Sequence, residues 1–306
     1  MAKIELIQVK GSSFFCSGRL SVGVYKQGDT VILVDSGIDS DTAKNIDAAI
    51  KAAGCSVAAI INTHHHPDHC GGNNYFQKKY PDLRIFASQF ESVFINNPFT
   101  HVLCFCNAAA PSTGLRNKYL EASISVVTNV ITPYEDQVIE INGEQFRIVT
   151  LPGHTFGSIG IITPDNVFYC GDAIFGEDTF NKHGVLFYTE IQSSLASFEK
   201  ITWLQIDATV FYHGGMLATI SATASKHARR MLETKDVIAQ IINVEGTGLP
   251  IDLVTQKIMN IYRIPQSEMS FALTRTCVTA FITQLELEKK IELIMRDGLL
   301  CVIEKK

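Results

Sequence analysis

The sequence lacks any uncharged apolar run long enough to cross a bilayer. Its first ten residues, MAKIELIQVK, carry Lys3, Glu5 and Lys10 among the apolar positions, unlike the continuous apolar segment of a secretion signal. We therefore expect neither a membrane span nor a secretion signal.

Paired cysteines are also missing. The eight cysteines are scattered and form no CxxC pair. In a chain without a secretion signal, such thiols are expected to stay reduced, which favours a cytoplasmic protein. Cys104 and Cys106, spaced C-x-C, give only a weak indication of a redox or metal role.

The chain has little clustered positive charge. Its net charge is −5, with a small positive surplus after residue 220 and a larger negative excess before it. The C-terminal part carries only short basic pairs, such as Arg229-Arg230, Lys289-Lys290 and Lys305-Lys306. Because nucleic-acid binding requires clustered Lys and Arg, the composition argues against a nucleic-acid partner.

The sequence contains enough apolar residues to form a large hydrophobic core. The 306 residues are 46% hydrophobic and 19% charged, which fits one large domain and a smaller one. Short β-like runs with an early βαβ pattern occupy residues 1–220. Residues 88–122 look irregular and are expected to form a lid or a long packed connection, with four phenylalanines available for an apolar pocket: Phe90, Phe94, Phe99 and Phe105.

The pattern changes to helical at about residue 221. Apolar residues recur at three- and four-residue steps over 224–246, 250–262 and 274–290, and Asp297-Gly298 between two β runs predicts a hairpin. We expect a main domain over 1–220 and a small, mainly helical, winged-helix-like domain over 221–306. A packing or dimerisation role for this module is favoured over DNA binding because its charge is weak.

One loop concentrates metal-binding side chains. The segment INTHHHPDHCGG places four histidines and an aspartate within six positions, directly after an apolar strand-like run. Borderline metal ions bind neutral imidazole and carboxylate. His64 and His66 are spaced to face one ion, and Asp68 and His69 a second, whereas His65 is expected to point away. Surface histidine tracts also occur without function, so the loop alone is ambiguous.

Three further residues resolve most of that ambiguity. His154 in LPGHTFGS, Asp172 in YCGDAIFG and His213 in VFYHGG each follow an apolar run. Residues at the ends of strands are where loops build sites on a rigid sheet.

The combination resembles the metallo-β-lactamase-fold hydrolases. Their H-x-H-x-D-H motif matches the loop at 64–69, and LVDSG at Asp35 resembles the family's early Asp-x-Gly turn. All seven ligand positions are filled: His64, His66, Asp68, His69, His154, Asp172 and His213. The resemblance covers about residues 1–220 and implies an α/β protein with an αββα sandwich.

The resemblance also implies a ligand scheme and a mechanism. One ion would be held by His64, His66 and His154, the other by Asp68, His69 and His213, and Asp172 would bridge them. Two divalent ions are expected, zinc first, with iron and manganese as alternatives. A metal-bridging hydroxide would attack a small ester, thioester or lactone. Asp68 is the candidate proton carrier to the leaving group, and Asp35 is expected to orient a ligand histidine.

Two other functional classes stay open. One is a metal-dependent endoribonuclease or phosphodiesterase, since some relatives with a winged-helix-like module cut RNA. The other is a di-iron or mono-iron redox enzyme on the same scaffold. The expected partner is a small-molecule substrate, and a homodimer is an option; neither the substrate nor the metal is identified.

Several residues have weaker claims. Cys70 and Cys170 lie next to ligand positions but are expected to be buried fillers. Tyr188 and Tyr212 are expected to be packed aromatics rather than substrate contacts. Tyr212 also departs from the family, which usually has Gly at this position. No motif pairs with the remaining histidines, His101, His183 and His227.

Overall fold

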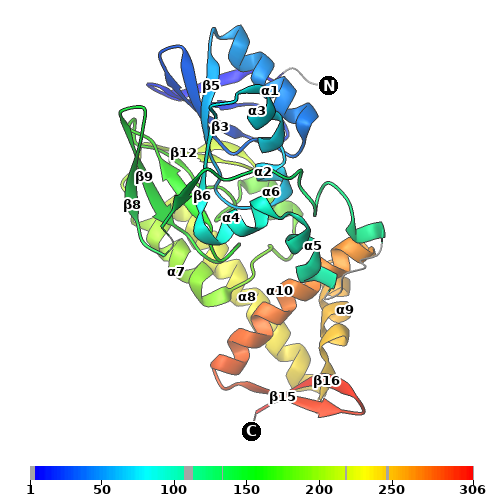
Figure 1. The fold of residues 1–306 in the computed structure, drawn as a ribbon. Helices are drawn as coiled ribbons and strands as arrows, with labels where there is room; N and C mark the ends of the chain where they lie inside the picture. The colour runs from blue at the N-terminus through cyan, green and yellow to red at the C-terminus, as the bar shows by residue number, and fades with distance from the viewer. Residues whose placement is uncertain (1–3, 107–112, 133, 218, 246–247, 306) are drawn as a thin grey trace.

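Two β-sheets pack face to face in the upper part of the view, as the computed structural model shows (Figure 1). It describes residues 4–106, 113–132, 134–217, 219–245 and 248–305. The first sheet has the order β1-β2-β3-β4-β5-β6-β7. Its strands are β1 (Leu6–Lys10), β2 (Ser13–Cys16), β3 (Val22–Gln27), β4 (Thr30–Val34), β5 (Ser56–Ile61), β6 (Arg84–Ser88) and β7 (Asn129–Ile131).

The second sheet has the order β13-β12-β11-β10-β9-β8. Its strands are β8 (Gln137–Ile141), β9 (Glu144–Thr150), β10 (Ile159–Ile162), β11 (Val167–Tyr169), β12 (Ala208–Phe211) and β13 (Gly215–Leu217). Neighbouring strands are antiparallel except β11 and β12, which are parallel.

Alternation along β4 shows how the layers form. Val31 and Leu33 enter an apolar cluster beneath the helices α1 (Ser40–Ala52) and α3 (Asn73–Lys79), whereas Ile32 and Val34 enter the cluster between the sheets. Successive side chains of a strand point to opposite faces, so a strand buried on both sides is apolar throughout. With α7 (Ile191–Thr202) on the second sheet, the arrangement confirms the predicted αββα sandwich.

The segment predicted to be irregular is largely helical where the structure describes it. It contains α4 (Gln89–Asn96), α5 (Phe99–Cys106) and the 3₁₀ turn η1 (Thr113–Leu115). Val102, Leu115 and Leu120 form a small apolar cluster with partly buried residues of α10 (Glu268–Leu287), including Leu273. The prediction of irregularity was therefore wrong, because the Asn97-Pro98 turn signals separate two short helices.

The C-terminal segment is a helical module with a three-stranded sheet of order β14-β16-β15. Its elements are α8 (Ser221–Glu245), β14 (Leu249–Pro250), α9 (Ile251–Ile261), α10, β15 (Ile291–Arg296) and β16 (Leu299–Glu304). The predicted hairpin is present, with positive φ at Asp297 (49°) and Gly298 (78°), as a two-residue hairpin turn favours. The winged-helix-like assignment and the boundary at 220/221 stay predictions.

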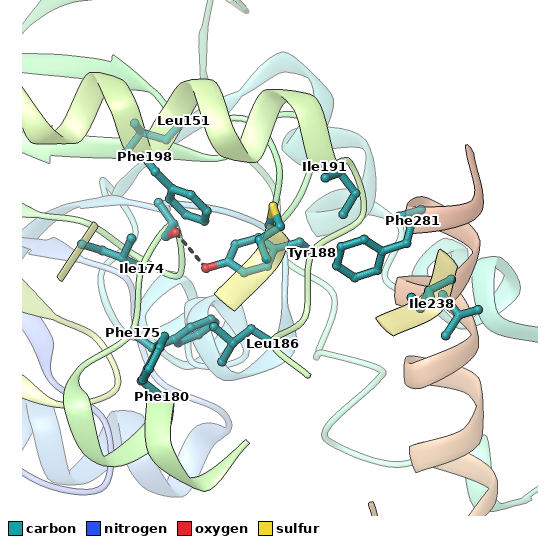
Figure 2. Packing of buried hydrophobic residues seen from close by; sticks show 14 of the residues in the cluster. Leu151, Ile174, Phe175, Phe180, Leu186, Tyr188, Ile191, Phe198, Ile238 and Phe281 are labelled. Atoms are coloured by element: carbon teal, nitrogen blue, oxygen red, sulfur yellow. Dashed lines mark hydrogen bonds between the residues drawn. The ribbon is translucent and has the colours of Figure 1, made fainter. Parts of the chain in front are cut away.

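The module packs on the main domain through apolar side chains (Figure 2). Tyr188 lies between the two parts, and its hydroxyl donates to the Ala173 carbonyl over 3.1 Å. One continuous buried cluster joins main-domain residues such as Ile191 and Phe198 to Ile238 of α8 and Phe281 of α10. The two parts therefore share a core. Among the helices that the structure describes, none is both long and apolar enough to cross a bilayer.

Candidate metal centre

The histidine loop lies between β5 and the short helix α2 (Pro67–Cys70). His66 is the N-cap of α2 and Pro67 occupies its first turn, where proline's fixed φ is favourable. The helix is followed by Gly71, where a Cβ atom would lie 2.0 Å from the carbonyl oxygen of Ile38. Glycine there lets the loop pack against the backbone after β4, and this fixes where the histidines point.

Three other side chains reach the same place from the second sheet. His154 follows β9, Asp172 follows β11 and His213 follows β12. Because β11 and β12 are parallel neighbours, their carboxyl ends lie at one edge of the sheet. The structure thus brings all seven candidate ligands together, although they come from four separate loops.

Four groups of three described residues have ligand atoms within 4.8 Å of one another, and two of these groups match the two expected ligand sets. In the first, His64, His66 and His154, the Nε2 atom of His154 lies 2.9 Å from the Nδ1 atom of His66. The second is Asp68, His69 and His213. Each group has the ligand types and spacing that a transition-metal ion accepts.

Asp172 lies between the two groups. Its Oδ1 atom is 3.3 Å from His69 Nε2, and its Oδ2 atom is 3.6 Å from His154 Nε2 and 3.5 Å from His213 Nε2. One carboxylate therefore faces histidines of both groups, as a bridging ligand must.

Buried polar atoms without hydrogen-bond partners indicate whether the site could hold a cation. Three buried atoms of the site have no hydrogen-bond partner among the described residues: His64 Nε2, His69 Nε2 and Asp172 Oδ1. The last two lie 3.3 Å apart but form no hydrogen bond with each other. Leaving such atoms unpaired costs about 1–3 kcal/mol each. Metal ions held by the two groups would satisfy all three, so the donor set fits divalent cations.

The protonation of the site is consistent with ligand chemistry. Burial, together with the neighbouring histidines, lowers the pKa of His64 and of His66, which keeps both imidazoles neutral. Burial raises the pKa of Asp172, but the charges of His213 and His69 outweigh it and hold that pKa well below its usual range. The first group therefore holds neutral imidazole. Burial lowers the pKa of His69 and of His213, but the charge of Asp172 outweighs it and raises both, so these two rings are protonated beside the ionised carboxylate and release the Nε2 proton when an ion binds.

Asp35 occupies the orienting position expected for it. Its buried carboxylate accepts a hydrogen bond from His69 Nδ1 at 2.8 Å and two from Thr63, from the backbone N–H and from Oγ1, both at 2.8 Å. When an ion binds, His69 therefore keeps its proton on Nδ1 and directs the Nε2 lone pair into the site. Sequence reasoning did not identify Thr63, which also contacts His64 Nδ1 at 3.1 Å.

We expect Asp35→Asn to lower metal affinity by about 10–100-fold, the usual cost of losing an outer-shell carboxylate. The amide keeps the shape of the side chain but removes the negative charge that fixes the His69 tautomer. Zinc binding measured against a competing chelator tests this, with the exposed Asp29→Asn as matched control. Equal affinity for both variants would contradict the orienting role.

The Nδ1 atom of His65 faces Glu91, and His65 belongs to neither of the two expected ligand sets. Its backbone N–H donates to Glu91 at 2.9 Å, and its Nδ1 also contacts that carboxylate. Thr155 Oγ1 at 2.7 Å and the Gly157 N–H at 2.8 Å complete the shell of this buried carboxylate. No sequence pattern identified Glu91, which lies on α4 in the segment expected to be irregular.

Most of the residues that the sequence indicated only weakly as site residues have packing roles. Tyr212 stacks on His69 at 3.8 Å between ring centroids and donates its hydroxyl to the Asp68 carbonyl, so it supports the ligand loop. Cys70 and Cys170 are buried, and burial raises the pKa of both thiols. Cys104 is exposed, and the side chain of Cys106 lies outside the described residues.

The unassigned histidines have different surroundings. His227 Nε2 is buried and accepts the N–H of Phe175 at 3.0 Å, and His183 is exposed. His101, for which the sequence offers no partner motif, has its ring centroid 4.9 Å from that of His65 and 5.0 Å from that of His66.

Aromatic rings line one side of the centre. Phe187 lies 5.6 Å from His66 and 5.5 Å from His154 between ring centroids, and Phe105 lies 6.5 Å from Phe187. Phe99 and Phe105 both pack against the small cluster that includes residues of α10. That the four phenylalanines line an apolar pocket stays a prediction.

Several curated relatives share the name hydroxyacylglutathione hydrolase. A hydroxyacylglutathione hydrolase from Vibrio campbellii is 24% identical over 229 residues, 73% of this chain and 75% of that protein. One from Synechococcus sp. is 26% identical over 181 residues, 57% of each protein. The chain spans about half the length of the first such relatives. Their names agree with the predicted class of metal-dependent hydrolase.

Solved structures share the fold. A metallo-beta-lactamase family protein from Thermus thermophilus has a TM-score of 0.72 at 17% identity and covers 93% of both chains. A beta-lactamase domain protein from Burkholderia ambifaria has a TM-score of 0.73 at 14% identity, over 98% of this chain and 93% of that one. A sequence profile of the Metallo-beta-lactamase superfamily matches residues 19–213, more than half of the chain. The chain belongs to the Metallo-beta-lactamase superfamily.

Proposed function

We propose that this protein is a binuclear metal-dependent hydrolase of small esters, thioesters or lactones. The observation that carries the proposal is the position of Asp172, whose two oxygens face histidines of both ligand groups while Oδ1 has no hydrogen-bond partner. The names of the curated relatives favour a thioester among these substrates.

The seven residues would divide as two sets with a bridge. His64, His66 and His154 would hold one ion, and Asp68, His69 and His213 the other. Asp172 would contact both. Zinc is the proposed metal, because mixed imidazole and carboxylate ligands suit it. When bound, two such ions lower the pKa of a shared water and stabilise negative charge developing on the acyl oxygen.

The chain's own groups would handle protons and orientation. Asp68 Oδ2 lies 3.2 Å from His213 Nε2, and 28% of the Asp68 side chain is exposed, so its carboxylate can meet a substrate and pass a proton to the leaving group. The hydroxyl of Tyr212 holds the Asp68 backbone in place. Asp35 fixes His69 by the hydrogen bond described above.

The surroundings favour an apolar acyl group. Phe187 is half-buried beside two of the histidines, and Phe105 and Phe94 continue this aromatic wall through His101 and His65. Apolar walls with a few polar groups are typical of small-molecule sites. Phosphate backbones instead need clustered cations, which the acidic main domain does not offer.

We expect the zinc-loaded protein to cleave at least one small thioester, ester or lactone, and to bind RNA only weakly and in a salt-sensitive way. A substrate panel including an RNA at physiological salt tests this, with the chelator-treated protein as control. Efficient zinc-dependent RNA cleavage without activity on any acyl substrate would contradict the proposal and favour a nuclease.

A further inference from the structure

A third group of histidines lies beside the proposed hydrolytic centre, which uses only one of them, His66. His65, His66 and His101 each offer one ring nitrogen, and these atoms lie within 4.8 Å of one another. His65 and His101 are 7% exposed, and His66 is half-buried. Three imidazoles converge here from two segments, the ligand loop and α5.

The hydrogen bonds of His65 and His101 show which ring nitrogen of each residue is free to bind a metal ion. His65 Nδ1 contacts the Glu91 carboxylate, and His101 Nδ1 lies 2.8 Å from the Leu120 carbonyl oxygen. A carboxylate and a carbonyl only accept hydrogen bonds, so both Nδ1 atoms carry the proton. The Nε2 atoms of His65 and His101 therefore present lone pairs, in the tautomer of a metal ligand.

His66 takes part in both groups. Its Nδ1 atom faces His154 Nε2 at 2.9 Å, in the first ligand set of the hydrolytic centre. The remaining nitrogen, Nε2, is the one available to the third group, and in the neutral ring it carries the proton when Nδ1 binds an ion. An imidazole has two nitrogens on different sides of its ring, so one side chain can face two sites.

Packing holds the other two rings in place. His65 stacks on Phe94 at 4.1 Å between centroids and 18° between ring planes, and Phe105 meets the edge of His101 at 5.0 Å. Glu91 adds a negative charge one hydrogen bond behind His65, the carboxylate–histidine arrangement that strengthens a metal ligand. Fixed rings with outer acceptors are how metal ligands are positioned.

We propose that His65, His66 and His101 form an accessory site for a divalent transition-metal ion, such as Zn²⁺, adjoining the hydrolytic centre. His65 and His101 would bind through Nε2, and His66 would bridge the two sites as an imidazolate, releasing its remaining ring proton to solvent as the ion binds. Three imidazole nitrogens leave at least one position of a tetrahedral ion open to solvent. This ion would be the third in the chain, in addition to the two ions of the hydrolytic centre. The number three therefore rests on the proposed function.

Metal counting tests the proposal. Full-length protein is dialysed to equilibrium against excess Zn²⁺, and bound zinc per chain is measured by mass spectrometry for the wild type and His101→Phe. We expect the variant to bind one ion fewer, because only two of the three ligands of that site remain. His101→Gln repeats the comparison with a polar side chain, and the melting temperature checks that each variant folds.

The controls separate the two proposals. Cys104→Ser, in the same helix, removes an exposed thiol and should leave the count unchanged. Asp172→Ala, measured in the same dialysis, reports on the hydrolytic centre and keeps all three accessory histidines. A wild type that saturates at two ions, or equal counts in the wild type and both His101 variants, overturns the accessory site and leaves the hydrolase standing. Unchanged zinc in Asp172→Ala counts against the hydrolytic centre instead.

Discussion

Asp172→Ala is expected to lose hydrolysis almost completely, with kcat/KM falling by roughly 1000-fold or more, since the electrostatic stabilisation from a paired metal centre is worth several kcal/mol. Asp172 has one oxygen toward His69 and the other toward His154 and His213. Removing it takes away the only carboxylate that faces both ligand groups among the described residues.

The measurement is kcat/KM on the best substrate of the panel, with zinc content determined on the same samples. Asp172→Asn keeps the shape and removes the charge, so it should also fail. Asp41→Ala is the matched control, because Asp41 is an exposed carboxylate on α1 paired only with Lys44 among the contacts described. Full activity in Asp172→Ala would contradict the bridging role.

Truncation after Ile220 is expected to give an insoluble or aggregating protein. The cut removes α8 and α10, whose Ile238, Val278 and Phe281 are buried in the same cluster as Phe198 of α7. Apolar surface of the main domain would then face water, and large exposed apolar patches drive association. Solubility and light scattering of the truncated chain measure the effect.

A point variant in the same interface checks the physical reason. Phe281→Ala should lower the free energy of unfolding by about 3–5 kcal/mol, because it removes a buried ring and leaves a cavity. Leu287→Ala is the control at the end of the same helix, where the side chain is 68% exposed. A soluble and fully active truncated protein would show that the module is not needed for the core, and the proposed boundary at 220/221 would then separate independent parts.

The ligand loop was recognisable from sequence because its residues are close in the chain. Spacing places His64, Asp68 and His69 around one short helix, and the later His154 and His213 each follow an apolar strand. Strand ends are visible as the limit of an apolar run, so residues there can be assigned to a sheet edge without coordinates.

The supporting residues were not recognisable in this way. Glu91 meets His65 across 26 positions of sequence, and His101 meets His66 across 35, with no local pattern joining either pair. Such contacts depend on how α4 and α5 pack over the loop. Short apolar segments give little periodicity, which is why these two helices were taken for irregular chain.

In the C-terminal module, one feature could be predicted from sequence and another could not. The hairpin followed from Asp297-Gly298, since local turn chemistry decides it. The sequence pattern did not predict that the module shares its core with Tyr188 and Phe198. An apolar helix face indicates that the face is buried, but not which surface packs against it. Whether the chain forms a homodimer stays a prediction.

Zinc titration of the metal-free, full-length protein against cleavage of a small thioester tests the central claim most directly. Protein stripped by chelator and checked for folding receives zinc in steps, and the initial rate is followed at each step. We predict no activity without zinc and a rate that rises to a plateau near two ions per chain, as the two ligand groups and Asp172 require. Full thioester cleavage by the stripped protein, or a folded chain that binds no zinc, would contradict the account.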